Sequence, residues 1–167
     1  MIGKIKGKLV ILNKLNNRIQ ISLSTKREIQ VHDGMDVSVC VINFKNKTFK
    51  YAGAKRPLVA LIDGELVVVN GDKFSIGSAF DNSVFETKDV ELKSSNQFYL
   101  FSDGYTDQFG GPEHRKFNRK RTFDLIESLN GVDIHRQKQI VESTHVNWKG
   151  NKNQTDDIVF VGCDISF

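Results

Sequence analysis

The sequence has few of the residues that cross-link a chain or interrupt its regular structure. Its 167 residues include two cysteines and two prolines, and they contain no CxxC pair and no Cys/His cluster. A disulfide framework and a thiolate metal site are therefore not expected. Cys40 and Cys163 both lie in apolar, strand-like runs, which predicts buried thiols in a reducing compartment.

Repeats, low-complexity tracts and apolar runs of membrane length are also missing, so neither a repeat protein nor a membrane-spanning protein is expected. The start, MIGKIKGKLVIL, is basic and then apolar. Polar residues follow it at once, and no small-residue cleavage site appears. We therefore predict a cytoplasmic protein without membrane contact.

Neither sign of charge dominates the chain. The net charge is +4, and the apolar fraction of 39% and charged fraction of 26% are ordinary for a soluble globular protein. The length is enough for one domain to bury its own core. We expect a single domain over residues 1–167.

Hydrophobic spacing predicts a helix at the N-terminus and then several strands. Apolar residues recur every three or four positions from Ile5 to Leu23, which is typical of one face of a helix. After a polar loop over 24–36, alternation predicts strands over 37–44 and 48–54, joined by a turn. These two strands should form a hairpin.

The rest of the chain adds more strands and then two helices. Asp63-Gly64 between two apolar runs is a strong hairpin signal. The remaining predicted elements are strands over 58–62, 66–69, 84–92 and 98–101, an insertion loop over 105–118, helices over 122–129 and 132–148, and a last strand over 158–165. The predicted order is one helix, five or six mostly antiparallel strands, two helices and a final strand. This order predicts an α+β sandwich-like domain.

Two acidic motifs stand at the ends of predicted strands. Asp103-Gly104 follows the apolar run Phe98–Phe101, and Asp156-Asp157 precedes the last apolar run. A carboxylate fixed by a strand and followed by glycine is a common way to place a ligand of a hard metal ion. The alternatives are a plain turn at Asp103-Gly104 and a solvated loop at Asp156-Asp157.

Three segments, KTFKYAGAKRPLVALIDGEL, FYLFSDGYTDQFGG and QTDDIVFVG, occur in this order. Together with the preceding DGMDVSVCVINF and the LNKLNN of the first helix, they resemble the C-terminal two-thirds of a SpoIIE/RsbU-type PP2C-like (PPM) serine/threonine phosphatase domain. The resemblance covers nearly the whole chain from about Leu9. Each motif alone is weak, but their joint occurrence is specific.

The resemblance implies a PP2C-like β-sandwich flanked by helices, in which central acidic residues hold two Mn²⁺ or Mg²⁺ ions. By motif match, Asp103 and Asp156 would be metal ligands, with Asp157 beside them and the Gly104 backbone at the site. Hard divalent cations prefer such oxygen ligands. No catalytic residue beyond the metal ligands is implied.

The chain departs from the family pattern at its start. The family's first acidic strand and its Asp-x-x-Gly-His-Gly segment, both upstream of the first helix, have no counterpart here. We therefore expect an N-terminally incomplete domain with half of its metal site. We expect low or absent phosphatase activity from this chain alone. We also expect open sheet edges that a second copy of the chain could cover by forming a homodimer.

Two functions follow from the resemblance. The first is metal-dependent hydrolysis of phosphoserine or phosphothreonine in a bacterial signalling protein, with a phosphoprotein or signalling regulator as partner. The second is a non-catalytic pseudophosphatase or scaffold that binds such a partner. Whether the chain is an enzyme stays open between them.

The basic segment HRKFNRKR over 114–121 raises a third possibility, a grip on nucleic acid. Such runs are more often a solvated loop and helix start, and we expect no nucleic acid partner. The histidines show no ligand spacing, and we expect His135 and His145, ten residues apart on one predicted helix, at the surface.

Overall fold

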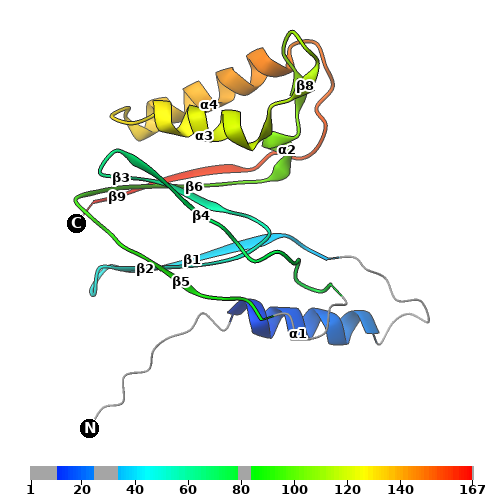
Figure 1. Ribbon diagram of the computed structural model, residues 1–167, viewed down its shortest axis with the longest axis vertical. Helices are drawn as coiled ribbons and strands as arrows, with labels where there is room; N and C mark the ends of the chain where they lie inside the picture. The colour runs from blue at the N-terminus through cyan, green and yellow to red at the C-terminus, as the bar shows by residue number, and fades with distance from the viewer. Residues whose placement is uncertain (1–10, 25–33, 79–83, 167) are drawn as a thin grey trace. The chain divides into compact units, whose positions relative to one another are not determined.

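The computed structural model describes residues 11–24, 34–78 and 84–166, and within them it contains four helices and nine strands (Figure 1). The chain forms two compact units. One unit combines the residues before Leu58 with residues 70–91, and the other combines residues 58–69 with the chain from Leu92 onward. The prediction of one domain over residues 1–167 stays a prediction.

The first unit consists of one helix and a three-stranded antiparallel sheet. The helix α1 (Ile11–Ser24) lies along the sheet of β1 (Val37–Asn43), β2 (Thr48–Ala54) and β5 (Lys88–Val90), whose order is β1-β2-β5 (Figure 1). The buried apolar core between them consists of Leu12, Ala52, Ala54, Ile76 and Phe85. Burial of one helix stripe against one sheet face is what the apolar spacing predicted.

The described part of the first helix confirms the helical prediction, although its predicted residues before Ile11 lie outside the described residues. The predicted hairpin is also confirmed, since β1 pairs with β2 from Val37 opposite Ala54 to Asn43 opposite Thr48. Most of the predicted loop over 24–36 lies outside the described residues.

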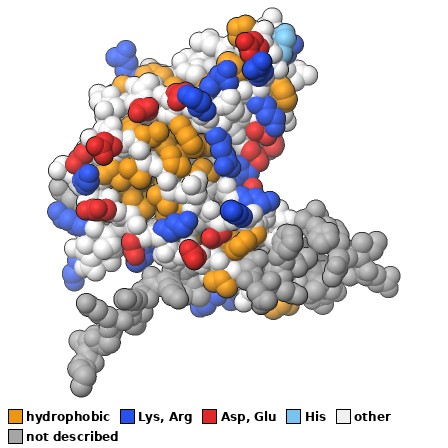
Figure 2. Space-filling model, viewed as in Figure 1, with side chains coloured by type: hydrophobic (Ala, Val, Ile, Leu, Met, Phe, Trp, Pro, Cys, Tyr) orange, Lys and Arg blue, Asp and Glu red, His pale blue; other side chains and the backbone are white. Residues whose placement is uncertain are grey.

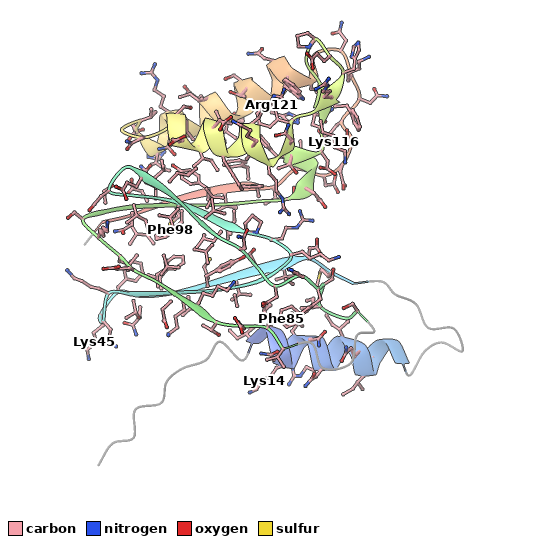
Figure 3. The ribbon with its side chains drawn as sticks, in the orientation of Figure 1. Lys14, Lys45, Phe85, Phe98, Lys116 and Arg121 are labelled. Carbon is pink, nitrogen blue, oxygen red and sulfur yellow. The ribbon has the colours of Figure 1, made fainter. Side chains whose placement is uncertain are left out.

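The predicted strand over 84–92 is wrong for most of its length. Only Lys88–Val90 pairs as β5. The preceding N–H groups are taken by side chains, since Phe85 N–H donates to Asn13 Oδ1 at 2.9 Å and Glu86 N–H donates to Asp72 Oδ2 at 2.9 Å. Phe85, beside α1 in Figure 3, is a core residue, so its apolar character reflects packing against a helix rather than a sheet ladder.

The second unit consists of a four-stranded antiparallel sheet with helices on one face. The strands are β3 (Leu58–Ile62), β4 (Glu65–Val69), β6 (Ser95–Phe101) and β9 (Phe160–Ser166), in the order β4-β3-β6-β9. The helices α3 (Asn118–Ser128) and α4 (Ile134–Lys149) cover one face of this sheet (Figure 1).

Local sequence accounts for the boundaries of several of these elements. The β3–β4 hairpin turns at Asp63 (φ 49°) and Gly64 (φ 83°), the left-handed pair that an Asp-Gly turn provides. The α4 helix begins after Asp133, whose carboxylate accepts from the N–H groups of His135 and Arg136, and it ends at Gly150 (φ 53°). Both predicted helices and the last strand are therefore confirmed, with shifted ends.

Aromatic side chains fill the space between the sheet and the helices of the second unit. Tyr105 packs edge-on against Phe117 and Phe160, with ring centroids 5.4 and 4.9 Å apart, and Phe101 stacks on Phe160. The buried cluster consists of Val59, Leu61, Tyr99, Phe101, Tyr105, Phe117, Ile126, Leu129 and Val141. Burial of aromatic rings on this scale makes the cluster the main stabilising element of the unit.

The predicted insertion loop over 105–118 is wrong. The segment forms the single-turn helix α2 (Asp103–Thr106) and a short hairpin of β7 (Phe109–Gly110) and β8 (Arg115–Lys116), and α3 then begins four residues earlier than predicted. Tyr105 and Phe117 are core residues, at 1% and 5% exposure. The segment is therefore ordered by long-range packing that local glycine and proline content does not reveal.

The two thiols are less buried than predicted. Cys40 on β1 is partly buried and Cys163 on β9 is exposed, and neither forms a disulfide. The prediction failed for Cys163 because β9 is the last strand of its sheet among the described residues, and an apolar run does not imply burial at such a position. In the described residues, no helix is both long enough and apolar enough to cross a membrane.

Candidate metal centre

Asp103 lies where the central strand of the second unit ends. The strand β6 stops at Phe101, Ser102 is extended, and Asp103 is the first residue of α2. Its carbonyl oxygen accepts from the N–H of Asp107 at 2.7 Å and from Oγ1 of Thr106 at 3.1 Å. The short helix therefore fixes the backbone of Asp103, and its side chain is half-buried.

Ser102 joins this segment to the second acidic motif. It occupies the N-cap position of α2, yet its hydroxyl does not cap the helix. Instead Oγ donates to the carbonyl oxygen of Asp157 at 3.0 Å and accepts from the N–H of Val159 at 2.9 Å. The backbone N–H of Ser102 also donates to the carbonyl oxygen of Val159, at 2.9 Å. These bonds hold the two motifs side by side.

Gly104 lies against the backbone of Asp156 and Asp157. A Cβ atom at this position would be 2.3 Å from the Asp157 carbonyl oxygen and 3.1 Å from that of Asp156. Any side chain would therefore push the two motifs apart. The glycine of the first motif is needed because the second motif occupies the space beside it.

Asp156 and Asp157 themselves are exposed. The Asp156 carboxylate accepts from the N–H of Asp157 at 2.7 Å, and its carbonyl oxygen accepts from Nε2 of Gln154 at 2.9 Å. The structure thus brings together the segments that carry all three predicted ligands. Their role as metal ligands stays a prediction.

Gln108 is a residue of this region that the sequence did not reveal as important. It is 0% exposed. Its Nε2 donates to the carbonyl oxygen of Asn153 at 2.9 Å, and its Oε1 accepts from the N–H of Thr155 at 3.2 Å. It therefore holds the loop that leads into Asp156. A buried, fully bonded glutamine has no sequence pattern of its own, although its place in SDGYTDQ puts it next to the motif.

Trp148 at the end of α4 supports the same arrangement. Its indole Nε1 donates to the Gln108 carbonyl oxygen at 3.0 Å, and its own carbonyl oxygen accepts from the N–H of Gly111 at 2.8 Å. The β7–β8 hairpin is therefore attached to α4 on both sides of its first strand. This attachment is the long-range contact that orders the segment predicted as a loop.

The residue that follows Gly104, Tyr105, belongs to the buried aromatic cluster of the second unit. Tyr105, one residue after Gly104, donates its hydroxyl to the Val141 carbonyl oxygen at 3.0 Å, and burial raises the pKa of this hydroxyl above its ordinary value. Tyr105 therefore stays neutral at any physiological pH. Its contribution is to anchor α2 to α4.

The basic segment over 114–121 is mostly engaged within the protein. Figure 3 shows Lys116 on β8 and Arg121 on α3. Lys116 pairs with Asp107 at 2.7 Å, Arg121 lies over the Trp148 ring at 4.7 Å, and the aromatic Phe117 is buried. On the face that Figure 2 shows, acidic side chains are interspersed among the lysines and arginines. Phe117 therefore serves the core, and Lys116 and Arg121 have partners within the protein, while the expectation of no nucleic acid partner stays a prediction.

The carboxylate oxygens of Asp103, Asp156 and Asp157 are of the type that a hard cation binds, but they are few. Aspartate oxygens are the ligands that Mn²⁺ and Mg²⁺ prefer. Within the described part of the chain, however, no group of three or more His, Cys, Asp or Glu side chains is close enough to hold a metal ion. The residues therefore fit one side of a metal site, and water or other groups would have to supply the remaining ligands.

His145 differs from the prediction for its helix. His135 is exposed as expected, but His145 is half-buried, with its ring 5.4 Å from that of Tyr105. Its Nε2 is buried and has no hydrogen-bond partner. Desolvation, and secondly the charge of Lys149, lower the pKa of His145. A position facing the aromatic cluster explains why a surface prediction failed.

Comparison with known structures places the fold. The chain is similar to the SiaA-PP2C domain of Pseudomonas aeruginosa, with 25% identity, a TM-score of 0.80 and coverage of 94% of this chain and 59% of that one. The chain thus spans less than two thirds of that relative. Comparison with curated protein sequences gave no match.

Two more distant structures share the fold. The phosphatase domain of the cell fate determinant SpoIIE from Bacillus subtilis is 13% identical, with a TM-score of 0.62 and coverage of 99% of this chain and 78% of that one. The S. agalactiae serine/threonine phosphatase is 14% identical, with a TM-score of 0.62 and coverage of 95% and 69%. The antiparallel α+β architecture predicted from the sequence is thereby confirmed as that of PP2C-like phosphatases.

The sequence model of one family matches residues 9–166, which is almost the whole chain and includes Asp103, Asp156 and Asp157. This match agrees with the resemblance carried by the SDG and DD motifs. The chain therefore belongs to the Stage II sporulation protein E (SpoIIE) family.

Proposed function

We propose that this chain contributes to metal-dependent hydrolysis of phosphoserine or phosphothreonine in a bacterial signalling protein, and that it does so weakly by itself. The observation that carries the proposal is the attachment of Ser102 and Gly104 to the backbone of Asp157. That attachment brings the segment of Asp103 beside Asp156-Asp157, at the end of a buried strand. Family membership supports the reaction class.

The carboxylates of Asp103 and Asp156 would bind Mn²⁺ or Mg²⁺, with Asp157 beside them. In a two-metal phosphatase the ions lower the pKa of a shared water and clamp the phosphoryl oxygens. The chain itself would supply the oxygen ligands, on a backbone that hydrogen bonds hold in place. Ser102, Gly104 and Gln108 fix the backbone that carries these ligands, and the buried Tyr105 anchors α2 to α4.

Weak activity is expected because two carboxylates, those of Asp103 and Asp156, leave most of an octahedral shell to water. Low affinity for the ions then limits the fraction of chain that is ready to react. We also propose, from family membership, a phosphoprotein or a signalling regulator as the partner, in the cytoplasm of a bacterium.

The alternative proposal is a non-catalytic pseudophosphatase or scaffold. The small number of grouped ligands in the described residues favours it. In that case the surface around Asp103 would bind a signalling partner without releasing phosphate.

The two proposals are separated by phosphate release from a phosphoserine peptide, measured with and without Mn²⁺ at high chain concentration. Hydrolysis is supported by slow release that requires Mn²⁺ and is lost in Asp103→Asn. An Asp124→Asn variant, changed at an exposed acid of α3, is the matched control and should keep the activity. No release, with peptide binding that is independent of Mn²⁺, would favour the scaffold. Fast multiple turnover would contradict the expectation of an incomplete metal site.

A further inference from the structure

The hairpin of β7 and β8 joins the basic segment to the candidate metal centre. Asp107 lies one helical turn after Asp103, and its carboxylate pairs with Lys116 on β8 at 2.7 Å (Figure 3). The N–H of Phe117 donates to the carbonyl oxygen of Gln108 at 2.9 Å, which closes the base of the hairpin. Lys116 is therefore held beside the helical turn that carries the first predicted ligand.

Contacts with Trp148 hold the tip of the same hairpin against α4. A Cβ atom at Gly110 would be 1.9 Å from the Trp148 carbonyl oxygen, and one at Gly111 would be 2.6 Å from the indole ring. Backbone that is packed this closely cannot shift without losing these contacts. The hairpin is therefore already ordered before any partner binds, which lowers the entropic cost of binding.

The hairpin and the start of α3 are rich in cations. Residues 107–121 contain five lysines and arginines but two aspartates and glutamates. Four of these cations are exposed, and we call them the basic surface: Arg115, Lys116, Arg119 and Lys120. A surface with this excess of positive charge attracts an anionic partner.

The ion pairs of the basic surface leave its cations accessible to a partner. Arg115 pairs with Glu113 and Lys120 pairs with Asp124, and the side chains in these two pairs are between 56% and 84% exposed. Ion pairs this exposed contribute little to stability, because water solvates both charges. Carboxylates of a bound partner can therefore take the place of Glu113 and Asp124.

An exposed aromatic ring stands beside these cations. Phe109 on β7 is 46% exposed and lies opposite Lys116 in the hairpin, with the Lys116 ammonium 5.9 Å from the centre of its ring. An aromatic side chain with cations around it suits a peptide that carries both acidic and apolar residues. A nucleic acid is disfavoured because Asp107 and Glu113 interrupt the basic track that a continuous row of phosphates needs.

We propose that the basic surface docks acidic residues of the phosphoprotein, so that the substrate is a phosphoserine or phosphothreonine with aspartates or glutamates a few positions away. This inference rests on the proposed function, because it assigns the substrate class of the same site. The attachment of the hairpin to Asp107 is what places docking and the candidate metal centre side by side.

Fluorescence anisotropy of labelled phosphoserine peptides with the full chain tests the docking. One peptide carries glutamates on both sides of the phosphoserine, and a second carries glutamines in their place. No metal is added, because glutamates themselves bind metal ions. The glutamate peptide should bind at least about tenfold more tightly, and this preference should shrink as salt is raised, because salt screens exposed charges.

Arg115→Glu should weaken binding of the glutamate peptide by at least about tenfold, because it reverses a charge of the basic surface. Arg119→Glu, at the start of α3, should weaken it in the same direction. Lys138→Glu on α4 is the matched control and should keep the preference, since Lys138 and Arg115 are 77% and 71% exposed and each pairs with one glutamate. Near-UV circular dichroism confirms that each variant is folded.

Equal binding of the two peptides would overturn the inference, and so would a preference that is unchanged in Arg115→Glu and Arg119→Glu. Tighter binding of a single-stranded RNA oligonucleotide than of the glutamate peptide would also overturn it. Release of phosphate with Mn²⁺ tests the proposed hydrolysis separately. A preference for the glutamate peptide without phosphate release would reject the hydrolysis while supporting the docking surface.

Discussion

Gly104 lies so close to Asp157 that a Cβ atom added to the glycine would be 2.3 Å from the Asp157 carbonyl oxygen. The contact joins residues that are far apart in the sequence and that carry the two acidic motifs. It gives the Asp-Gly pair a structural reason beyond a turn, because the glycine makes room for the backbone of the second motif.

Gly104→Ala should therefore lower the free energy of unfolding by about 1–3 kcal/mol, the usual cost of forcing an extra methyl group into a packed site. Thermal or urea unfolding measures the change. Gly162→Ala is the matched control, because a Cβ there would meet its nearest atom at an ordinary 3.5 Å. If both variants unfolded alike, the close contact at Gly104 would not be a constraint.

Ser102→Ala should cost about 0.5–1.5 kcal/mol of stability, because the hydroxyl both donates to Asp157 and accepts from Val159. Hydrogen exchange should show faster exchange at Val159, whose N–H loses its acceptor. The exposed Ser143 hydroxyl donates to a carbonyl oxygen of its own helix, so Ser143→Ala should change little. Equal protection of Val159 in both variants would count against the link between the motifs.

Gln108→Ala should release the loop before Asp156, because the side chain bonds to Asn153 and Thr155 from a fully buried position. Loss of a buried, doubly bonded amide leaves backbone groups unsatisfied and should cost about 1–3 kcal/mol. Limited proteolysis should then cut within residues 151–157. Gln139→Ala, at an exposed position of α4, is the control and should resist proteolysis like the unchanged chain.

His145 should make stability depend on pH. Burial lowers its pKa in the folded state, so the unfolded chain binds a proton first as the pH falls. The stabilising effect of neutral His145 is complete above its ordinary pKa of 6.5, and it is lost as the pH falls from there toward the lower pKa of the folded state.

His145→Gln should therefore flatten the fall in the free energy of unfolding on the acid side of pH 6.5. Urea unfolding at a series of pH values measures this slope. His135→Gln, at an exposed position of the same helix, should keep the slope of the unchanged chain. An unchanged slope in His145→Gln would show that the buried ring is not the group responsible.

The sequence predicts the elements whose shape is set locally. The Asp63-Gly64 hairpin depends on two residues that adopt positive φ readily, and Asp133 and Gly150 bound α4 by direct capping. The position of both acidic motifs at strand ends allowed them to meet, and the pairing of β6 with β9 in the structure brings their segments together.

What the sequence does not predict is set by contacts between distant residues. The segment after Asp103 is ordered because Trp148, some forty residues later, bonds to Gln108 at 3.0 Å. Phe85 leaves the predicted strand because Asn13 binds its backbone. Cys163 is exposed because β9 is the outermost strand of the sheet in the described part of the chain, and this position depends on the topology of the sheet rather than on the residues of the strand.

We propose that the carboxylates of Asp103 and Asp156 bind one hard divalent cation together. Isothermal titration of the chain with Mn²⁺ measures this binding. We expect weak binding that is lost in Asp103→Asn and in Asp156→Asn and is kept in Asp164→Asn, whose exposed carboxylate bonds to Gln97 on the same sheet. Binding of Mn²⁺ that is as tight in Asp103→Asn as in the unchanged chain, or no binding at all, would show that these two aspartates do not form the site.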